Sequence, residues 1–278
     1  MSASTAPQLR EVTGPSALGG GRRRFFDLLW LMSVTEFRRI YFGTVLGYLW
    51  SLVRPLLLFT VLLFVFTKVV RLGSDVPNYP VLLLLNIVLF TFFSEATQNA
   101  VGSVVTQEGV VRKTQFPRLV IPLAVVLTTL FNLGLNLLVV LAFLLAWGVD
   151  PSWTWLLVPL PILALIVITT AVSTALSVLY VRFRDTMIIW AVLSQVLFYG
   201  TPVIYPIEIV PEQYADIMMI NPLVPIFDQI RVWALDPSAP SAVDVAGGVV
   251  GLIPAAVVFI GVCAFSVWIF RRDAPRIA

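Results

Sequence analysis

The sequence has 278 residues, of which 59% are hydrophobic and 12% are charged, and its formal net charge is +3. Soluble domains carry about 45–50% apolar and about 25% charged residues, so this composition excludes an ordinary soluble protein and indicates a polytopic membrane protein. The basic residues are spread through short loops, which argues against nucleic acid as a partner.

Several kinds of chemistry are excluded by the residue types present. The sequence has no histidine, which removes Ser–His and Cys–His nucleophile pairs, histidine metal sites and histidine proton relays. The only lysines, Lys68 and Lys113, do not follow a glycine as the phosphate-binding loop G-x-x-x-x-G-K-[ST] requires. We therefore predict no catalytic residue, metal site or cofactor in this chain, and any ATP-driven work must come from another chain. The lone Cys263 cannot form an intrachain disulfide.

The N-terminal part predicts a tail followed by an amphipathic helix. Residues 1–24 are expected to be a disordered cytoplasmic tail, and 25–42 an interface helix lying in the headgroup layer. The helix has one apolar arc, formed by Phe26, Leu29, Trp30, Ser33, Val34, Phe37, Ile40 and Tyr41. Acidic and basic residues fill its other side. The alternative is a soluble surface helix followed by a buried one.

Six apolar segments then predict an all-α membrane protein with about six transmembrane helices, because each is long enough to cross a bilayer. We place the spans near 46–70, 80–103, 118–147, 154–181, 187–205 and 244–270. The whole transmembrane domain is 46–270, and 271–278 is a second cytoplasmic tail. No internal repeat supports an inverted-repeat secondary transporter.

The distribution of charge predicts the orientation. Arginines crowd the N-terminal segment, the 104–118 and 182–184 loops and the C-terminus, whereas acidic residues dominate the opposite loops. Because basic residues stay on the cytoplasmic side, both termini are expected inside.

The segment 104–118 is polar and basic and ends at Pro117. It is either a plain cytoplasmic loop or a short coupling segment that docks on a partner. In the second case Val110 and Val111 supply apolar contacts, and Glu108, Arg112 and Lys113 supply charges at the rim.

Polar side chains recur at helical spacing in spans two, three and four, and they are expected to face the bundle or a wet cavity. Most Ser, Thr and Asn residues are equally consistent with interhelical hydrogen bonding. Glu95 is an intramembrane carboxylate and so a functional candidate, although it could also reach cytoplasmic water.

The stretch from Tyr199 to Ser241 is interrupted by prolines. Pro202 and Pro206 break the fifth span, and two short helices follow, opened by Pro211 and Pro222. We predict re-entrant or gate helices in an extracellular gate region at 206–240, the alternative being a structured external loop.

These features together resemble the type-2 ABC exporter permeases of the O-antigen, teichoic acid and polysaccharide export group. The resemblance covers residues 25–270 in order. It is carried by the segments YFGTVLGYLWSLVRP at 41–55, FFSEA at 92–96, RFRD at 182–185, TPVIYP at 201–206 and Asn221-Pro222.

The resemblance implies a homodimer of six-span subunits in the bacterial inner membrane, each bearing a separate nucleotide-binding ATPase that holds ATP and Mg²⁺. It implies that a lipid-linked glycan passes between the two permeases. The expected ATPase-docking residues are Arg38, Arg39, Glu108, Val110, Val111, Arg112 and Lys113. The expected residues of the translocation path or gate are Tyr48, Trp50, Arg54, Phe93, Glu95, Tyr199, Pro202, Tyr205 and Asn221. Arg54 departs from the family, in which an uncharged polar residue is frequent before the proline.

Three other functions were weighed. The same fold could export a drug or a small lipid. An integral-membrane transferase would need an acid or base cluster on one face, which the scattered carboxylates do not supply. A channel or secondary transporter is disfavoured because intramembrane charge is nearly limited to Glu95.

Overall fold

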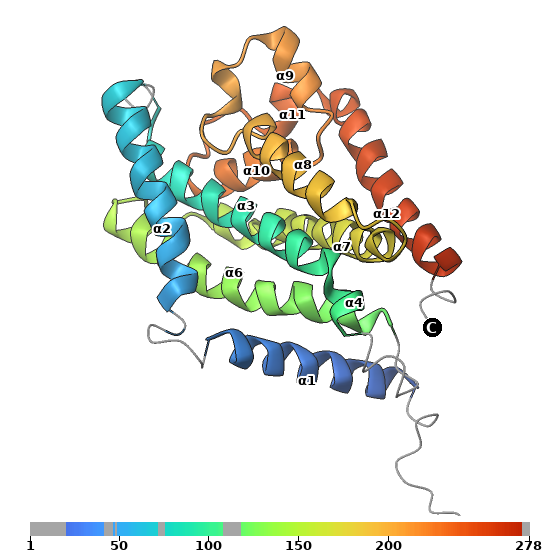
Figure 1. Ribbon diagram of the computed structural model, residues 1–278. Helices are drawn as coiled ribbons and strands as arrows, with labels where there is room; N and C mark the ends of the chain where they lie inside the picture. The colour runs from blue at the N-terminus through green and yellow to red at the C-terminus, as the bar shows by residue number, and fades with distance from the viewer. Residues whose placement is uncertain (1–20, 42–46, 48, 72–75, 108–117, 274–278) are drawn as a thin grey trace, which may run out of the picture.

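The computed structural model describes residues 21–41, 47, 49–71, 76–107 and 118–273. These ranges form helices joined by turns and contain no strand (Figure 1). The all-helical prediction is confirmed for this part of the chain. Tyr48, most of the coupling segment (108–117) and most of both predicted tails lie outside the described ranges.

Five helical segments are long and apolar enough to cross a membrane. They are α2 (Leu49–Phe64) continued by η1 (Val65–Val69), α3 (Tyr79–Val101), α6 (Val120–Ala146), η3 (Trp153–Leu157) with α7 (Pro159–Arg182), and η5 (Val249–Leu252) with α12 (Ile253–Asp273). The first four lie within three residues of the predicted spans one to four.

The fifth and sixth predicted spans differ from the observed helices. α8 (Thr186–Gly200) has only 15 residues, because Thr201 adopts an extended conformation (φ −107°, ψ 143°) before Pro202. A proline disfavours the helical conformation of the residue before it. The last span begins at Val249 instead of 244, because Gly247 and Gly248, with φ of 68° and 115°, separate it from a short capped helix.

α3 is the centre of the bundle. It packs against α2, α6, α7 and α8, and 78% of its most apolar stretch is buried, against 11% for α2 and for α12. Figure 1 shows α3 crossing the middle of the molecule, with α2 and α12 at its two sides. The main hydrophobic core forms around it and includes Leu83, Ile87, Leu89 and Leu165. α3 is therefore the element to which α2, α6, α7 and α8 are all fixed, whereas α12 packs on α7 and α1 packs on α6.

The remaining elements lie at the edges of this bundle. α1 (Gly21–Tyr41) packs along α6, and Figure 1 shows the two helices side by side. α4 (Ser103–Thr106) follows α3 after Gly102. Of the short helices, α10 (Leu223–Ala234) packs against α7 and α3, and α11 (Ala242–Val245) packs against α10. α9 (Glu212–Met218) lies at the edge of the molecule, away from α3 (Figure 1). α9 and α10 occupy the positions predicted for two short helices.

Candidate functional site

The helix break after α8, residues 201–206, is stabilised by hydrogen bonds from side chains of α3. Residues 201–206 are non-helical and almost wholly buried, so their backbone groups need partners inside the protein. The Tyr79 hydroxyl donates to the carbonyl oxygen of Ile204 at 2.8 Å, and Asn86 Nδ2 donates to that of Pro202 at 3.0 Å. Two backbone acceptors of the break are thus satisfied from one neighbouring helix.

Predicted gate residues gather around the same break. Asn221 Nδ2 donates to Thr201 Oγ1 at 3.0 Å, while its Oδ1 accepts from the backbone N–H of Leu223 at the start of α10. The Tyr205 hydroxyl donates to the carbonyl oxygen of Tyr199 at 2.9 Å. The structure therefore brings Pro202, Tyr205 and Asn221 together. Asn221 connects the break to α10.

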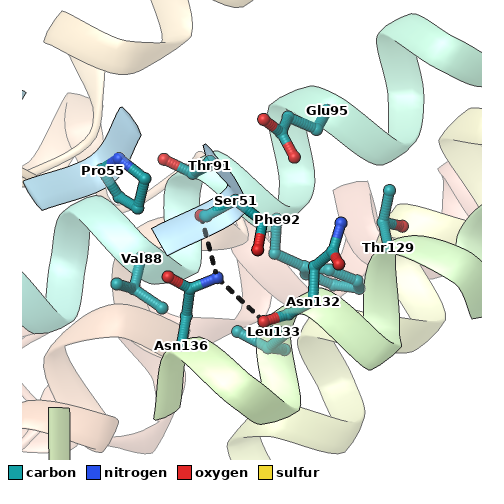
Figure 2. A pocket seen from close by; sticks show the side chains of 10 residues that line it. All are labelled: Ser51, Pro55, Val88, Thr91, Phe92, Glu95, Thr129, Asn132, Leu133 and Asn136. Atoms are coloured by element: carbon teal, nitrogen blue, oxygen red, sulfur yellow. Dashed lines mark hydrogen bonds between the residues drawn. The ribbon is translucent and has the colours of Figure 1, made fainter. Parts of the chain in front are cut away.

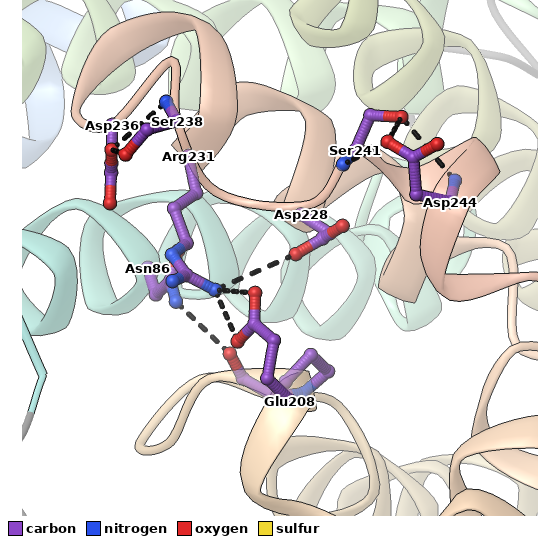
Figure 3. Close-up of polar contacts among 9 residues, drawn as sticks. Asn86, Glu208, Asp228, Arg231, Asp236, Ser238, Ser241 and Asp244 are labelled. Atoms are coloured by element: carbon purple, nitrogen blue, oxygen red, sulfur yellow. Dashed lines mark hydrogen bonds and ion pairs between the residues drawn. The ribbon is translucent and has the colours of Figure 1, made fainter.

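An ion cluster formed by the buried Asp228 and Arg231 of α10 and the exposed Glu208 lies next to this break (Figure 3). Arg231 of α10 contacts both carboxylate oxygens of Glu208 at 2.6 Å, and Asp228 Oδ1 at 3.9 Å. The side chains of Arg231 and Asp228 are 10% and 2% exposed. Because removing one member of such a group leaves a buried charge without compensation, the cluster fixes α10 to the segment that carries Glu208.

Asp228 is the weakly compensated member of the cluster. Burial and the nearby negative charge of Glu208 raise its pKa to about 7, and Arg231 only partly opposes them. Its Oδ2 atom is buried without a hydrogen-bond partner among the described residues. A protonated Asp228 side chain therefore suits this position better than a carboxylate.

A second polar group lies inside the helix bundle, between α2, α3 and α6 (Figure 2). Glu95 and Thr91 of α3, Ser51 and Pro55 of α2, and Asn132 and Asn136 of α6 line a cavity of about 10 Å³. This is about the room that one water molecule needs. Asn136 Nδ2 donates to the carbonyl oxygens of Asn132 at 2.9 Å and Ser51 at 3.5 Å, which links α6 to α2.

The predicted path residues fall into three environments. Glu95 lines the polar cavity and interacts electrostatically with Arg54, which is exposed on α2. Trp50 and Tyr199 are also exposed, at 44% and 58%. Phe93 is 2% exposed and packs against Phe90 and Trp190, so it belongs to the core. The structure does not bring these residues into a single site. Their part in a path stays a prediction.

The polar stripes are satisfied mainly within their own helices. Thr97, Thr170 and Thr174 each donate to the carbonyl oxygen four residues earlier. Contacts between helices are fewer: the Trp190 indole N–H donates to Thr97 Oγ1 at 3.0 Å, and the hydroxyls of Ser94 and Ser194 lie 3.0 Å apart. Interhelical hydrogen bonding thus accounts for part of the pattern. In the described ranges no three His, Cys, Asp or Glu side chains are grouped to hold a metal ion.

The predicted docking residues are described only in part. Arg38 and Arg39 are exposed on α1, and Arg39 pairs with Glu36 at 2.6 Å. α1 is fixed to α6 by the buried Ser33, whose backbone carbonyl accepts from Thr128 Oγ1 at 3.2 Å. The predicted residues Glu108, Val110, Val111, Arg112 and Lys113 lie outside the described ranges.

Several helices expose apolar faces, among them α2, α8 and α12. On α2 the exposed side chains include Leu57, Val61 and Phe64, each at least 58% exposed. On α8 they include Ile188, Val192 and Val196, each at least 60% exposed. Apolar faces of this size are found where a helix meets lipid or another membrane-embedded chain.

Comparison with known families decides the identity of the fold. The model of the ABC-2 type transporter family matches residues 27–235, which include most of α1, most of the bundle and α10. The chain belongs to the ABC-2 type transporter family. Membership implies a multi-pass membrane subunit that works with an ATPase partner.

Relatives of this ABC-2 transporter chain have names that agree with one another. It is 32% identical over 199 residues to the O-antigen export system permease protein RfbA of Klebsiella pneumoniae, which covers 71% of this chain and 76% of the relative. Identity to RfbA of Myxococcus xanthus is 29%, over 74% of this chain and 80% of the relative. Identity to the polysialic acid transport protein KpsM of Escherichia coli is 24%, over 67% of this chain and 72% of the relative.

Sequence reasoning about this ABC-2 transporter missed the residues that hold the break. Asn86 is the one polar residue in the apolar run 81–90, and Tyr79 stands beside the proline that opens the same span. A lone amide within an apolar run was a usable signal. Nothing local in the sequence indicated that Arg231 pairs with Glu208, 23 positions earlier.

Proposed function

We propose that this chain is the transmembrane subunit of an ATP-driven exporter that moves a polyprenyl-linked polysaccharide or glycolipid from the cytoplasmic to the outer face of the bacterial inner membrane. The observation that carries the proposal is that the three relatives described above, each matched over two thirds or more of both chains, are named for the export or transport of O-antigen or polysialic acid. The chain itself lacks the phosphate-binding loop, so a separate ATPase hydrolyses ATP.

The proposed topology has six spans, with α8 as a short fifth span and both termini in the cytoplasm. α1 lies on the cytoplasmic side of the bundle, against the first half of α6, and α9 and α10 form the outer gate. Exposure of Phe26, Trp30 and Ile40, all on the apolar arc of α1, supports contact with the headgroup layer. The loops with many arginines support the orientation.

The proposed functional unit is a homodimer. The exposed apolar faces of α2 and α8 meet their symmetry mates across the path, and the lipid-linked glycan passes between them. Trp50, Arg54 and Glu95 lie toward the cytoplasmic half of the path, and Tyr199 and Tyr205 toward the outer gate. The ATPase docks on α1 and on the 104–118 segment.

Docking can be tested by copurification from cells that express the permease with its candidate ATPase. We expect the double variant V110D/V111D to lose the ATPase and to stop export, because the two valines supply the apolar contacts of the coupling segment. The matched control is V110I/V111I, which keeps both side chains apolar and should keep the ATPase and export. Undiminished export by V110D/V111D, or a purified permease with no associated ATPase, would contradict the proposal.

The substrate class can be tested on the reconstituted complex. We expect ATP hydrolysis to be stimulated by a polyprenyl-linked glycan and much less by the polyprenyl phosphate without sugar. Stimulation by small amphipathic drugs but not by the glycolipid would favour a drug exporter of the same fold instead.

A further inference from the structure

A large apolar groove lies on the side of the bundle formed by α6, α7 and α12. Its volume is about 490 Å³, within the range of about 300–1,000 Å³ typical of small-molecule sites. The lining includes Leu123 of α6, Ile166 and Thr170 of α7, and Cys263 and Val267 of α12. None of the residues assigned to the translocation path lines this groove, so it is a separate feature of the molecule.

The side chains that line the groove are mostly apolar and therefore favour an apolar occupant. Thr170 and Thr174 lie in the groove, but their hydroxyls donate to the carbonyl oxygens of Ile166 and Thr170 at 2.7 and 2.8 Å. Both threonines therefore need no further hydrogen-bond partner. The other described lining residues are mostly Leu, Ile, Val, Ala and Phe.

One end of the groove carries a positive charge. Arg271 is the one charged side chain among its described lining residues, and it lies in the last turn of α12. In the described part of the chain Arg271 has no ion-pair or hydrogen-bond partner, whereas its neighbour Arg272 lies over the ring of Trp268 at 5.1 Å. A guanidinium at the membrane surface attracts a phosphate.

The length of the groove limits the kind of lipid. From Cys263 to Arg271 it extends about 12 Å along α12, at about 1.5 Å per residue. That is less than half of a hydrocarbon core of about 30 Å, so the groove matches one acyl chain from a single leaflet. A polyprenyl chain is much longer than this.

We propose that the groove between α6, α7 and α12 binds an anionic phospholipid of the cytoplasmic leaflet, with one acyl chain along Thr170 and Val267 and the phosphate on Arg271. The leaflet follows from the proposed orientation. The site is otherwise independent of the exported substrate. The lipid fills a surface cavity where α12 meets α7 and so strengthens the contact of the last span with the bundle.

The chain contains its own probe for this site. Cys263 is the single cysteine of the sequence and lines the groove. In detergent-purified full-length protein, we expect dioleoyl phosphatidylglycerol to slow the alkylation of Cys263 by N-ethylmaleimide several-fold, and dioleoyl phosphatidylcholine to slow it less. R271Q should raise the phosphatidylglycerol concentration for half-protection about fivefold. R272Q, the matched control, removes a positive charge one position away and should leave the half-protecting concentration of phosphatidylglycerol unchanged.

A second measurement maps the occupant directly. A phosphatidylglycerol with a diazirine in its acyl chain should crosslink to α7 and α12 residues of the groove, and V267W should remove these adducts by filling it. V257W, at a site 61% exposed elsewhere on α12, should not. Three results would each overturn the proposal. R271Q and R272Q could change the half-protecting phosphatidylglycerol concentration equally, or Cys263 could be protected in lipid-free protein, which would indicate a second protein chain in the groove. Protection of Cys263 by polyprenyl phosphate alone would be the third.

Discussion

At the scale of single residues, the least usual feature is the group formed by Glu208, Asp228 and Arg231. Arg231 contacts both carboxylate oxygens of Glu208 at 2.6 Å but Asp228 only at 3.9 Å, so Glu208 receives the stronger compensation. Buried ion pairs stabilise weakly by themselves, but the loss of one partner is strongly destabilising. The group therefore fixes where α10 lies more than it adds stability.

Replacing the shared cation tests this explanation. We expect R231A to lower the free energy of unfolding by about 1–3 kcal/mol, because Glu208 loses its hydrogen-bonded counter-charge and Asp228 loses its nearest cation. The measurement is thermal unfolding in detergent. R39A is the control: Arg39 has an equally short contact to Glu36, but its side chain is 73% exposed, and exposed pairs contribute about 0–1 kcal/mol. Similar losses in both variants would contradict a buried network.

The pH dependence of stability tests the protonation of Asp228. Its pKa rises from 3.8 in the unfolded chain to about 7 in the folded protein. A group whose pKa rises on folding stabilises the protein below the unfolded pKa, and this contribution is lost as the pH rises toward the folded pKa. Wild-type stability should thus fall between about pH 4 and pH 7 relative to D228N. D216N, at an exposed site on α9, should follow the wild type. Parallel profiles for wild type and D228N would argue against a buried acid.

At the scale of elements, α3 determines where the non-helical segment after α8 can lie. Tyr79 and Asn86 are two turns apart on the same helix, and both donate to carbonyls of residues 201–206. Irregular backbone inside a membrane protein is tolerated where the protein itself satisfies it. Pro202 thus ends the fifth span, and two side chains of the second span stabilise the non-helical segment that follows.

Removing one of these donors should loosen the segment. We expect Y79F to lower the free energy of unfolding by about 1–3 kcal/mol, because the buried carbonyl of Ile204 keeps no equivalent donor. N86L should act similarly through Pro202. Y214F makes the same chemical change at a side chain that is 55% exposed and should stay within about 0.5 kcal/mol of wild type. An unchanged Y79F protein would mean that water replaces the tyrosine at this carbonyl.

At the scale of the whole molecule, burial is uneven. α3 is enclosed by its neighbours, whereas α2 and α8 leave apolar faces uncovered. A homodimer that meets along these faces would cover them partly and leave a path for the substrate. The groove at α12 lies on a different set of helices.

Crosslinking tests the proposed dimer. C263S gives a cysteine-free background, since the sequence has one cysteine. In that background V192C on α8 and L57C on α2 should each crosslink to the same position in a second copy, at levels that change between ATP-bound and nucleotide-free complexes. V257C on α12, which is equally exposed, should not crosslink. Crosslinks that ignore the nucleotide would contradict an ATP-driven movement of these helices.

The long spans could be predicted from the sequence, because apolar length alone defines them. Tyr79–Val101 and Val120–Ala146 lie within three residues of the predicted 80–103 and 118–147. The prolines at 202, 211 and 222 correctly marked the break and the two short helices. Hydrophobicity could not show where the fifth span ends, because Val203, Ile204 and Tyr205 are apolar yet non-helical.

The interior of the site could not be predicted, because it depends on contacts between distant segments. The sequence marks Glu95 as a candidate, but nothing in its span indicates that it lines one cavity with Ser51 and Asn136. Nothing in the sequence indicates that the ring of Phe93, an expected path residue, packs against Phe90 and Trp190 in the core. Sequence periodicity identifies a face of a helix; it does not identify the neighbour of that face.

One consequence follows from the position of α3. At one end it continues through Gly102 into α4, which leads toward the segment proposed to meet the ATPase. Near its other end it donates two hydrogen bonds to the backbone after α8. In the proposed orientation, a displacement of the ATPase-docking segment would thus be transmitted along α3 to the residues that follow α8, without involving the exposed helices α2 and α12.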